Sequence, residues 1–286
     1  MTIAWPQAIV DAIARRRSVL LIGSGVSANS EGQDGAHPDT WGNFLREAYK
    51  NLKRKIVYID NALKQYDYLA ACDFLKSEYG PEWPNVIRKS FVSPRFKACV
   101  IHKSIFELDS RIVVSLNFDD IYEKYAIRQS DNTVIVKNYY DDDIRQAVAG
   151  ADRYVLKPHG SVDSISKMIF TLEDYAKARV ENASFYEILT ALLHTHTFLC
   201  VGCGLSDPDM KIIFEDYRYK FNEFPHYMTL PAPVSPAECL LIQKTRGLNV
   251  LKYSKYRGHK ELSESLRELA VLVSERRNEM ASSQDW

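Results

Sequence analysis

The stretch SVLLIGSGVS, residues 18–27, predicts the fold because it joins a buried strand to a glycine turn. Its first half is an uninterrupted, mostly apolar run of the kind found in fully buried parallel strands. Gly23 and Gly25 then allow the backbone to turn tightly and to approach a diphosphate closely. An ordinary strand-to-helix turn explains these two glycines equally well, and Ala28 stands where a dinucleotide fingerprint has its third glycine.

A second buried run, residues 111–115, ends in two polar side chains that project from the end of a strand. Asn117 and Asp119 follow it directly, while Phe118 between them is expected to point the other way and pack. Helix capping explains Asp119, because an aspartate is a good N-cap before the helical pattern that follows. Capping does not explain Asn117. We therefore predict that this loop lies beside the glycine turn, where open α/β sheets bind nucleotides.

Strand and helix patterns alternate along the rest of the chain, which predicts an α/β fold with a Rossmann-like, doubly wound and mostly parallel sheet covered on both faces. Further strands are predicted at 133–136, 153–157, 167–171, 197–202, 226–230 and 248–252. An ordinary crossover between parallel strands needs about a dozen residues, but mostly helical patterns fill the much longer interval before residue 111. We interpret residues 1–286 as a single domain in which 41–108 form an inserted helical subdomain.

Two more motifs follow predicted strands. His159 precedes Gly160 at the end of the run at 153–157, a position suited to acid–base chemistry because the histidine pKa lies near neutrality. The loop that holds Gly202, Gly204 and Ser206 is a second place for close approach to a ribose or phosphate. A helix cap explains its Ser-Asp-Pro end equally well. The other six histidines are interpreted as structural: His37, His102, His194, His196, His226 and His259.

Composition limits the possible partners and the compartment. The 37 basic and 37 acidic residues cancel, so no charge excess favours direct binding to nucleic acid or to an anionic membrane. No apolar run approaches the ~20 residues that span a bilayer, and no signal peptide is evident, which predicts a cytoplasmic protein. Five cysteines favour reduced thiols. The pair Cys200 and Cys203 has no second ligand pair, so no metal site is predicted.

Taken together, the four motifs resemble those of the sirtuin superfamily over roughly residues 15–275. The family's Gly-Ala-Gly-x-Ser loop corresponds to residues 23–27, its Asn-x-Asp motif to 117–119, its His-Gly motif to 159–160 and its late glycine loop to 202–206. The zinc-binding cysteines of the deacylase branch are absent from 161–199, and its Gly-Ile-Pro-Asp-Phe-Arg stretch is degenerate at 38–41. The chain is therefore similar to the bacterial antiphage branch, which includes Thoeris effectors and the sirtuin-like partners of short Argonautes and HerA-type ATPases.

This resemblance implies an NAD+ glycohydrolase that releases nicotinamide and ADP-ribose and acts as the NAD-depleting effector of abortive infection. Asn117 and His159 would be catalytic, His159 as the general base, and Trp41 or Phe118 would shield the site. The expected NAD+-binding residues are Gly23, Ser24, Gly25, Val26, Ser27, Asp119, Gly202, Gly204 and Ser206. Two alternatives stay open: a non-catalytic subunit that binds NAD or ADP-ribose, and an NAD-dependent protein deacylase. A homo-oligomer is expected, together with a gating partner such as a HerA-type ATPase or an Argonaute-like protein.

Overall fold

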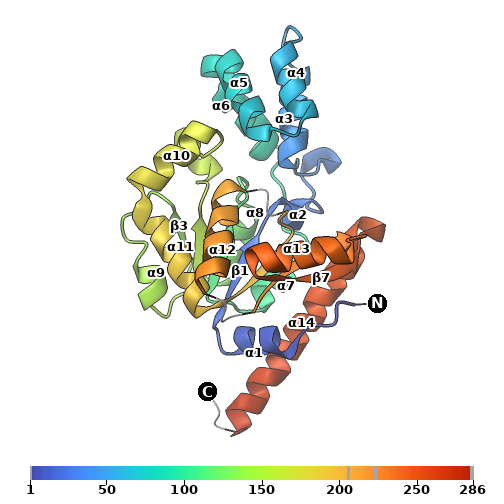
Figure 1. Cartoon of the computed structure of the whole chain (residues 1–286), viewed down its shortest axis with the longest axis vertical. Coiled ribbons are helices and arrows are strands. Elements are labelled where there is room, and N and C mark those ends of the chain that lie inside the picture. Colours follow the sequence, from blue (N-terminus) through green and yellow to red (C-terminus); the bar gives the residue numbers. More distant parts are fainter. Residues whose placement is uncertain (1, 205–206, 222–224, 284–286) are drawn as a thin grey trace.

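A seven-stranded sheet forms the centre of the computed structural model, which describes residues 2–204, 207–221 and 225–283 (Figure 1). The strands are β1 (Ser18–Ile22), β2 (Ile112–Ser115), β3 (Ile135–Asn138), β4 (Tyr154–Lys157), β5 (Thr197–Val201), β6 (His226–Ala232) and β7 (Leu248–Ser254). The helices are α1 (Gln7–Ala14), α2 (Ser24–Ser27), α3 (Trp41–Lys50), α4 (Val57–Lys64), α5 (Tyr68–Tyr79), α6 (Trp83–Phe91), α7 (Val100–Glu107), α8 (Ile121–Gln129), α9 (Gln146–Ala149), α10 (Leu172–Glu181), α11 (Ala183–Thr195), α12 (Pro208–Lys220), α13 (Pro236–Arg246) and α14 (Tyr256–Ser283). Short 3-10 turns lie at Gln33–Gly35, Gly80–Glu82 and Val162–Lys167.

All neighbouring strands are parallel, in the order β3-β4-β2-β1-β5-β6-β7. This confirms the predicted doubly wound, Rossmann-like sheet. From β1 the chain first builds the side that holds β2, β4 and β3, and later returns to pair β5 with the other side of β1. The carboxyl ends of β1 and β5 therefore flank the point where the direction of winding reverses, which is where sheets of this class bind ligands.

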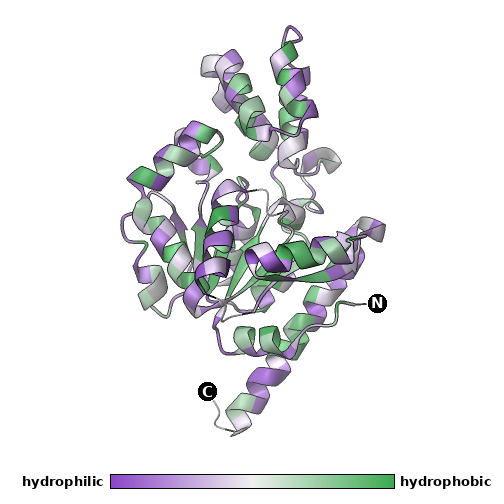
Figure 2. Cartoon of the chain, viewed as in Figure 1, coloured by the Kyte–Doolittle hydropathy of each residue, from purple (hydrophilic) through white to green (hydrophobic). Residues whose placement is uncertain are grey.

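The central strands β1, β2, β4 and β5 are buried on both faces, as their continuous apolar runs predict. On one face, Leu20 and Ile22 of β1 pack in a core that includes residues of α1, α7, α8 and α14. On the other face, Val19 and Leu21 pack in a core with residues of α11 and α12. Figure 2 shows the mainly hydrophobic strands between helices in which hydrophobic and hydrophilic residues alternate. Successive residues of a strand thus serve opposite cores, which fixes the orientation of the loop that follows β1.

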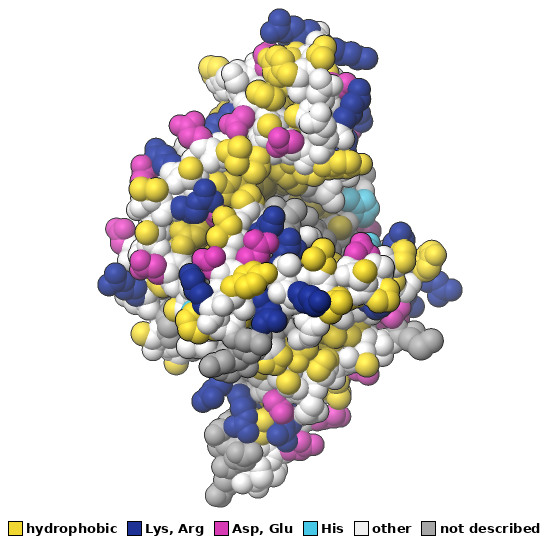
Figure 3. Space-filling model, viewed as in Figure 1, with side chains coloured by type: hydrophobic (Ala, Val, Ile, Leu, Met, Phe, Trp, Pro, Cys, Tyr) yellow, Lys and Arg dark blue, Asp and Glu magenta, His cyan; other side chains and the backbone are white. Residues whose placement is uncertain are grey.

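Helices α3 to α6 form a group that projects away from the sheet at the top of Figure 1. Their core contains Phe44, Ile59, Leu75 and Trp83, and Phe118 packs against it from the loop after β2. Hydrophobic side chains gather on the surface near the junction between this group and the rest of the molecule (Figure 3). Helix α7 lies inside the range 41–108 that the sequence assigns to the insertion. Its apolar residues nevertheless belong to the core beneath the sheet, with those of α14.

The expected strand at 167–171 is wrong, because this segment is a 3-10 turn followed by an irregular extended stretch. Ile169 and Phe170 are buried, which accounts for the strand-like apolar pattern. Their backbone groups bond elsewhere: the Ile169 N–H donates to the His159 carbonyl, and the N–H groups of Phe170 and Thr171 donate to the Asp174 carboxylate. Asp174 thereby forms a capping box at the start of α10, and the segment closes over the loop after β4.

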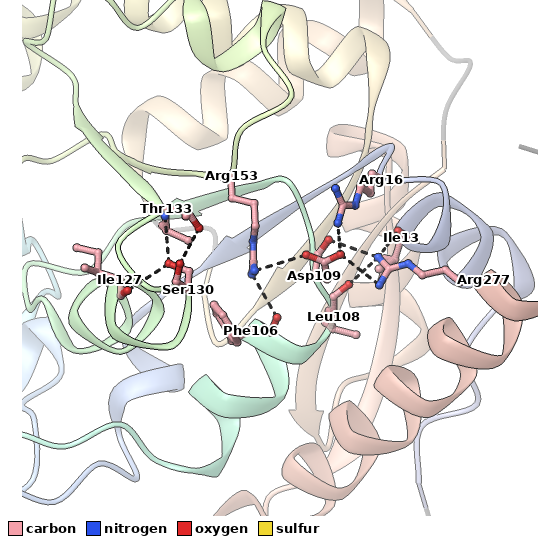
Figure 4. A network of polar contacts seen from close by, with 11 residues as sticks. Ile13, Arg16, Phe106, Leu108, Asp109, Ile127, Ser130, Thr133, Arg153 and Arg277 are labelled. Atoms are coloured by element: carbon pink, nitrogen blue, oxygen red, sulfur yellow. Dashed lines mark hydrogen bonds and ion pairs between the residues drawn. The ribbon is translucent and has the colours of Figure 1, made fainter. Parts of the chain in front are cut away.

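The amino edge of the sheet is held by a network of charges around Asp109 (Figure 4). This carboxylate, which precedes β2, pairs with Arg16 before β1, Arg153 before β4 and Arg277 of α14. Arg277 also donates to backbone carbonyls at the ends of α1 and α7. The network therefore joins the amino ends of β1, β2 and β4 to α1, α7 and α14, on the side of the sheet opposite the predicted nucleotide loops. Within the described ranges, no helix is both long and apolar enough to cross a membrane.

Candidate functional site

The four sequence motifs meet in one cavity at the carboxyl ends of β1, β2, β4 and β5. These strands are adjacent in the sheet, so the loops that leave them converge although they are separated by up to 180 residues in the chain. The cavity has a volume of about 290 Å³, close to the lower end of the ~300–1,000 Å³ range of small-molecule sites. The residues that line it are Gly23, Ser24, Asp39, Trp41, Tyr66, Asp67, Tyr68, Leu69, Phe91, Leu116, Asn117, Phe118, Asp119, His159, Ile169, Phe170, Tyr175, Cys203, Gly204, Asp207 and Pro208.

Asn117 lines this cavity with a buried side chain that is only half satisfied. Its Nδ2 atom donates to the Ser27 hydroxyl at 3.2 Å. Its Oδ1 atom is buried and has no hydrogen-bond partner within the described part of the chain. A buried carbonyl oxygen without a donor costs about 1–3 kcal/mol, so it is the kind of group that a ligand donor is expected to satisfy.

Asp119 lies beside Asn117 and serves both the helix and the cavity. Its Oδ1 atom accepts the Ile121 N–H at 3.1 Å at the start of α8, but the N-cap of this helix is Asp120 and not Asp119 as the sequence predicted. Burial raises the pKa of Asp119 to about 6, with the Glu123 carboxylate adding to the rise and the Lys157 ammonium opposing it. The carboxylate is therefore a group whose charge changes between mildly acidic and neutral pH.

Lys157, which the sequence analysis did not single out, holds the backbone of the Asn117–Asp119 segment in place. Lys157 is the last residue of β4, and its fully buried ammonium group lies 2.6 Å from Oε1 of Glu123. It donates to the backbone carbonyls of Asn117 at 2.6 Å and Asp119 at 2.8 Å. One charge thus holds both ends of the Asn-Phe-Asp segment, and the acidic partner on α8 compensates for its burial.

His159 projects from the loop after β4 with contacts at both ring nitrogens. Nδ1 lies 3.1 Å from the Leu116 carbonyl, and Nε2 lies 2.8 Å from Oδ2 of Asp207. Burial alone would lower the pKa of His159. The Asp207 carboxylate, through charge and hydrogen bonding, and the Leu116 carbonyl outweigh burial and raise it above its ordinary value.

Asp207 and Tyr175 are site residues that the sequence analysis missed in this role. Asp207 caps α12 through Oδ1, which accepts the Met210 N–H at 2.8 Å. Its second oxygen faces the cavity and accepts the Tyr175 hydroxyl at 2.7 Å, in addition to contacting His159. A Ser-Asp-Pro sequence indicates the cap, but no local signal shows that the other oxygen reaches a histidine 48 positions earlier.

The two glycine loops pack directly against each other. The Gly25 N–H donates to the Gly202 carbonyl at 2.9 Å. A Cβ at Gly25 would lie 2.9 Å from the Gly202 Cα, and one at Gly23 would lie 2.7 Å from the Cys203 Cβ. At these positions the missing side chains allow contact between the loops after β1 and β5. A Cβ at Gly204, by contrast, would meet no described atom within 4 Å.

The predicted binding residues therefore separate into two groups. Those that line the cavity are Gly23, Ser24, Asp119 and Gly204, together with the predicted catalytic pair Asn117 and His159. Those absent from its lining are Gly25, Val26, Ser27 and Gly202; the Ser27 hydroxyl is turned toward Asn117. Ser206 lies outside the described residues. Cys200 is buried in β5 as predicted, whereas Cys203 reaches the cavity wall.

Aromatic side chains form one wall of the cavity. The ring centroids of Trp41 and Phe118 are 5.2 Å apart, and those of Phe118 and Phe170 are 4.6 Å apart. Phe118 does pack, as predicted, but its packing partners include this wall. Trp41 also brings the α3 end of the helical group to the site, which gives the cavity an apolar side opposite its polar residues.

The polar residues can support a hydrolytic reaction on a small polar ligand. They provide an unsatisfied acceptor at Asn117, a titratable carboxylate at Asp119 and a histidine paired with a carboxylate at His159. In the ranges 2–204, 207–221 and 225–283, no three His, Cys, Asp or Glu side chains are grouped as metal ligands. Proton transfer and electrostatic stabilisation are the chemistry that these side chains themselves supply.

Comparisons with known proteins point to one family. A family model described as a SIR2-like domain matches residues 111–251. The chain is 28% identical over 169 residues, 57% of its length, to a protein named NAD(+) hydrolase ThsA from Enterococcus faecium. It is 27% identical over 128 residues, 44% of its length, to a protein of the same name from Acinetobacter baumannii. It is also 21% identical over 253 residues, 85% of its length, to Defense-associated sirtuin 2 from Bacillus subtilis.

These relatives are much longer than the region that matches. The aligned segment spans 35% of the Enterococcus faecium protein, 26% of the Acinetobacter baumannii protein and 24% of the Bacillus subtilis protein. The similarity therefore concerns about a quarter to a third of the length of each relative.

Proposed function

The chain contains a SIR2-like domain, and from this premise we propose that it hydrolyses NAD+ at the bond between nicotinamide and ribose. The observation that carries the proposal is the buried, unpartnered Oδ1 of Asn117 in the same cavity as His159. The names of two relatives, both NAD(+) hydrolases, support the choice of substrate. The carboxyl edge of a doubly wound sheet supports nucleotide binding.

In the proposed reaction, the C1′–N bond breaks and nicotinamide leaves as a neutral ring, so the leaving group needs no general acid. Water adds to C1′ and loses a proton. Asn117 accepts a hydrogen bond from the water or from a ribose hydroxyl through Oδ1. His159 takes the proton at Nε2, because Nδ1 donates to the Leu116 carbonyl. Oδ2 of Asp207, which lies 2.8 Å from the same Nε2, then accepts the new N–H and stabilises the imidazolium.

The aromatic wall and the glycine residues have separate parts in this proposal. Trp41, Phe118 and Phe170 shield the reacting ribose from bulk water, which strengthens the polar contacts inside. Gly23, Ser24 and Gly204 lie where the backbone is open to the cavity and are assigned to the phosphate side of the ligand. Asp119 is assigned to the nicotinamide carboxamide.

We also propose that this activity serves antiphage defence by depleting NAD+. One relative is named a defense-associated sirtuin, which supports that setting. An uncontrolled NAD+ hydrolase is toxic to its own cell, so we expect gating by self-assembly or by a partner such as a HerA-type ATPase or an Argonaute-like protein. The deacylase alternative would require an acylated peptide for any loss of NAD+.

The test is NAD+ turnover by the full chain, alone and with candidate partners, followed by chromatography of nicotinamide and ADP-ribose. Asn117→Ala and His159→Ala are each expected to lower kcat by about 10²–10⁴-fold. His196→Ala, at the amino end of β5 and thus at the opposite edge of the sheet, is the matched control and should keep wild-type activity.

Three outcomes decide between the alternatives. Peptide-independent release of nicotinamide that both site variants abolish supports hydrolysis. Thermal stabilisation by NAD+ or ADP-ribose without turnover in any assembly supports a binding subunit instead. Turnover that needs an acylated peptide supports the deacylase.

A further inference from the structure

We propose that His102 is a positioning residue that acts through Ser27 to turn the Oδ1 atom of Asn117 toward the substrate. The inference rests on the proposed function for what the substrate is, and on a chain of hydrogen bonds for how the amide is oriented. His102 lies on α7, behind the wall that Asn117 presents to the cavity. It shares no motif with Asn117, and the sequence analysis interpreted it as structural.

The first link fixes the tautomer of His102. The backbone N–H of Cys99 lies 3.2 Å from Nδ1 of His102. An N–H group can only donate, so Nδ1 must be an unprotonated acceptor. The Cys99 thiol lies 3.2 Å from the same atom, and it also donates to the Val26 carbonyl at 3.5 Å, so the backbone N–H alone determines the state of Nδ1. Burial lowers the pKa of His102 to about 4, so the ring is neutral at physiological pH and carries its single proton on Nε2.

The second link fixes the roles of the Ser27 hydroxyl. Nε2 of His102 lies 3.4 Å from Ser27 Oγ and donates to it, because it holds the only ring proton. An interaction with Ser27 opposes the rise in the pKa of Asp119, and because an ionised carboxylate can only accept a hydrogen bond, we infer that the Ser27 hydroxyl directs its proton toward Asp119. Ser27 thus gives its proton to Asp119 and receives one from His102. One acceptor position on its oxygen is left.

The third link fixes the amide of Asn117. Because Ser27 has only an acceptor position to offer, the Asn117 group that lies 3.2 Å from it must be the NH₂ group. Oδ1 is then directed away from Ser27, and this is the atom that lacks a partner within the described residues. The Cys99 N–H, a backbone group that no side-chain flip can reverse, thereby sets the orientation of a catalytic amide on another element.

A helix cap is the competing explanation for His102. Cys99 is the N-cap of α7, and His102 occupies the third helical position, from which its ring satisfies the N-cap backbone. That role needs only Nδ1. The contact between Nε2 and Ser27 is separate, so the two roles can be tested by replacing one nitrogen at a time.

Substituting His102 by asparagine or by glutamine replaces one of its two ring nitrogens at a time. The amide of His102→Asn reaches the position of Nδ1 and preserves the acceptor for Cys99 but does not extend to Ser27. The amide of His102→Gln reaches the position of Nε2 and supplies an N–H to Ser27. A positioning role predicts that His102→Asn lowers kcat on NAD+ about tenfold, with KM within about twofold, whereas His102→Gln stays within about threefold of the wild type.

The opposite order overturns the proposal: if His102→Gln loses more kcat than His102→Asn, the cap alone explains the residue. An effect confined to KM overturns it as well. His226→Asn is the matched control, because His226 is also buried and its Nδ1 accepts the Phe198 N–H at 3.1 Å. It should change thermal stability without a specific loss of kcat, since His226 does not line the cavity.

A second measurement decides the orientation without any activity. Nitrogen NMR of the ¹⁵N-histidine-labelled wild type should show His102 as the Nε2–H tautomer with an unprotonated Nδ1 at neutral pH. An Nδ1–H tautomer, or a ring charged at neutral pH, overturns the proposal even where variants fail to fold. If the wild type proves inactive on NAD+, the proposed function fails, while the tautomer still decides whether His102 orients Asn117.

Discussion

Nε2 of His159 lies 2.8 Å from Oδ2 of Asp207, and this carboxylate oxygen also accepts the Tyr175 hydroxyl at 2.7 Å. Nδ1 of His159 contacts the Leu116 carbonyl. A histidine with a carboxylate at one nitrogen and a carbonyl at the other is stabilised in its charged form. In the proposed reaction, such a histidine must lose its proton before it can act as a base. Asp207 therefore sets the pH above which His159 is deprotonated and can accept a proton from water.

Replacing Asp207 by asparagine is expected to move the acid limb of the kcat/KM profile to lower pH. The general base works only when deprotonated, so activity is lost as the pH falls through the pKa of His159. The Asp207 charge raises that pKa, with a smaller contribution in the same direction from Asp209. The measurement is NAD+ turnover across pH 5–9.

Asp216→Asn is the matched control for this prediction, since Asp216 lies exposed on the same helix and pairs with Lys220. Its profile should coincide with that of the wild type. An unchanged acid limb in Asp207→Asn would show that Asp207 does not set the protonation of His159.

Asp119 is expected to destabilise the folded protein at neutral pH. Its pKa is raised from 3.8 to about 6, first by burial, so the folded state loses stability relative to the unfolded state as the pH rises from about 4 to above 6. The difference corresponds to on the order of 3 kcal/mol. Asp119→Asn should therefore raise the melting temperature at pH 8 and change it little at pH 4.

Asp120→Asn provides the comparison, because the neighbouring Asp120 pairs with Lys124 on the solvent side of α8. It should show no such gain at pH 8. If Asp119→Asn is less stable than the wild type at both pH values, the carboxylate contributes more through its contacts with Ser27 and Ile121 than its burial costs.

The sequence predicts the strands and the polar groups at their ends, because both are local patterns. Runs such as 18–22 and 111–115 are mostly apolar, and Asn117 and His159 closely follow such runs. Their convergence in one cavity depends on the order of strands in the sheet, which places β2 and β4 side by side. Composition and periodicity alone do not give that order.

The missed residues share a different cause. Lys157, Asp207 and His102 act through partners 34 to 75 positions away, and each has a local pattern that already accounts for it. Lys157 ends a strand, Asp207 caps a helix and His102 completes a capping box. A side chain with two roles shows only its local role in the sequence, because the second depends on distances that tertiary packing sets. The strand expected at 167–171 failed for a related reason, since burial there comes from tertiary contacts of a loop.

Removing the Lys157 charge is expected to be among the most destabilising substitutions in the chain. Lys157→Met leaves the Glu123 carboxylate buried without its cation, and breaking a buried pair in this way costs about 3–5 kcal/mol. Chemical denaturation measures the loss. The double variant Lys157→Met with Glu123→Leu removes both charges and should recover most of the stability.

The same pair of variants separates stability from function. Lys157 also donates to the carbonyls of Asn117 and Asp119, and no methionine can replace those bonds. The double variant should therefore be folded but slow on NAD+. Wild-type turnover in the double variant would show that the loop holds its shape without Lys157.

The contact between the two glycine loops gives a prediction in which neighbouring glycines behave differently. Gly202 has φ of +64°, and a Cβ there would lie 2.6 Å from the backbone nitrogen of Val26. Gly202→Ala is expected to cost about 2 kcal/mol or more, because only backbone atoms are available to move. The displaced segment includes α2, which carries Ser27, so NAD+ turnover should fall as well.

Gly204→Ala is the comparison, because no described atom lies within 4 Å of the new Cβ. Its free energy of unfolding, measured with denaturant, should stay within about 0.5 kcal/mol of the wild-type value. Equal losses of stability at the two positions would show that the contact between the loops is not what requires glycine at Gly202.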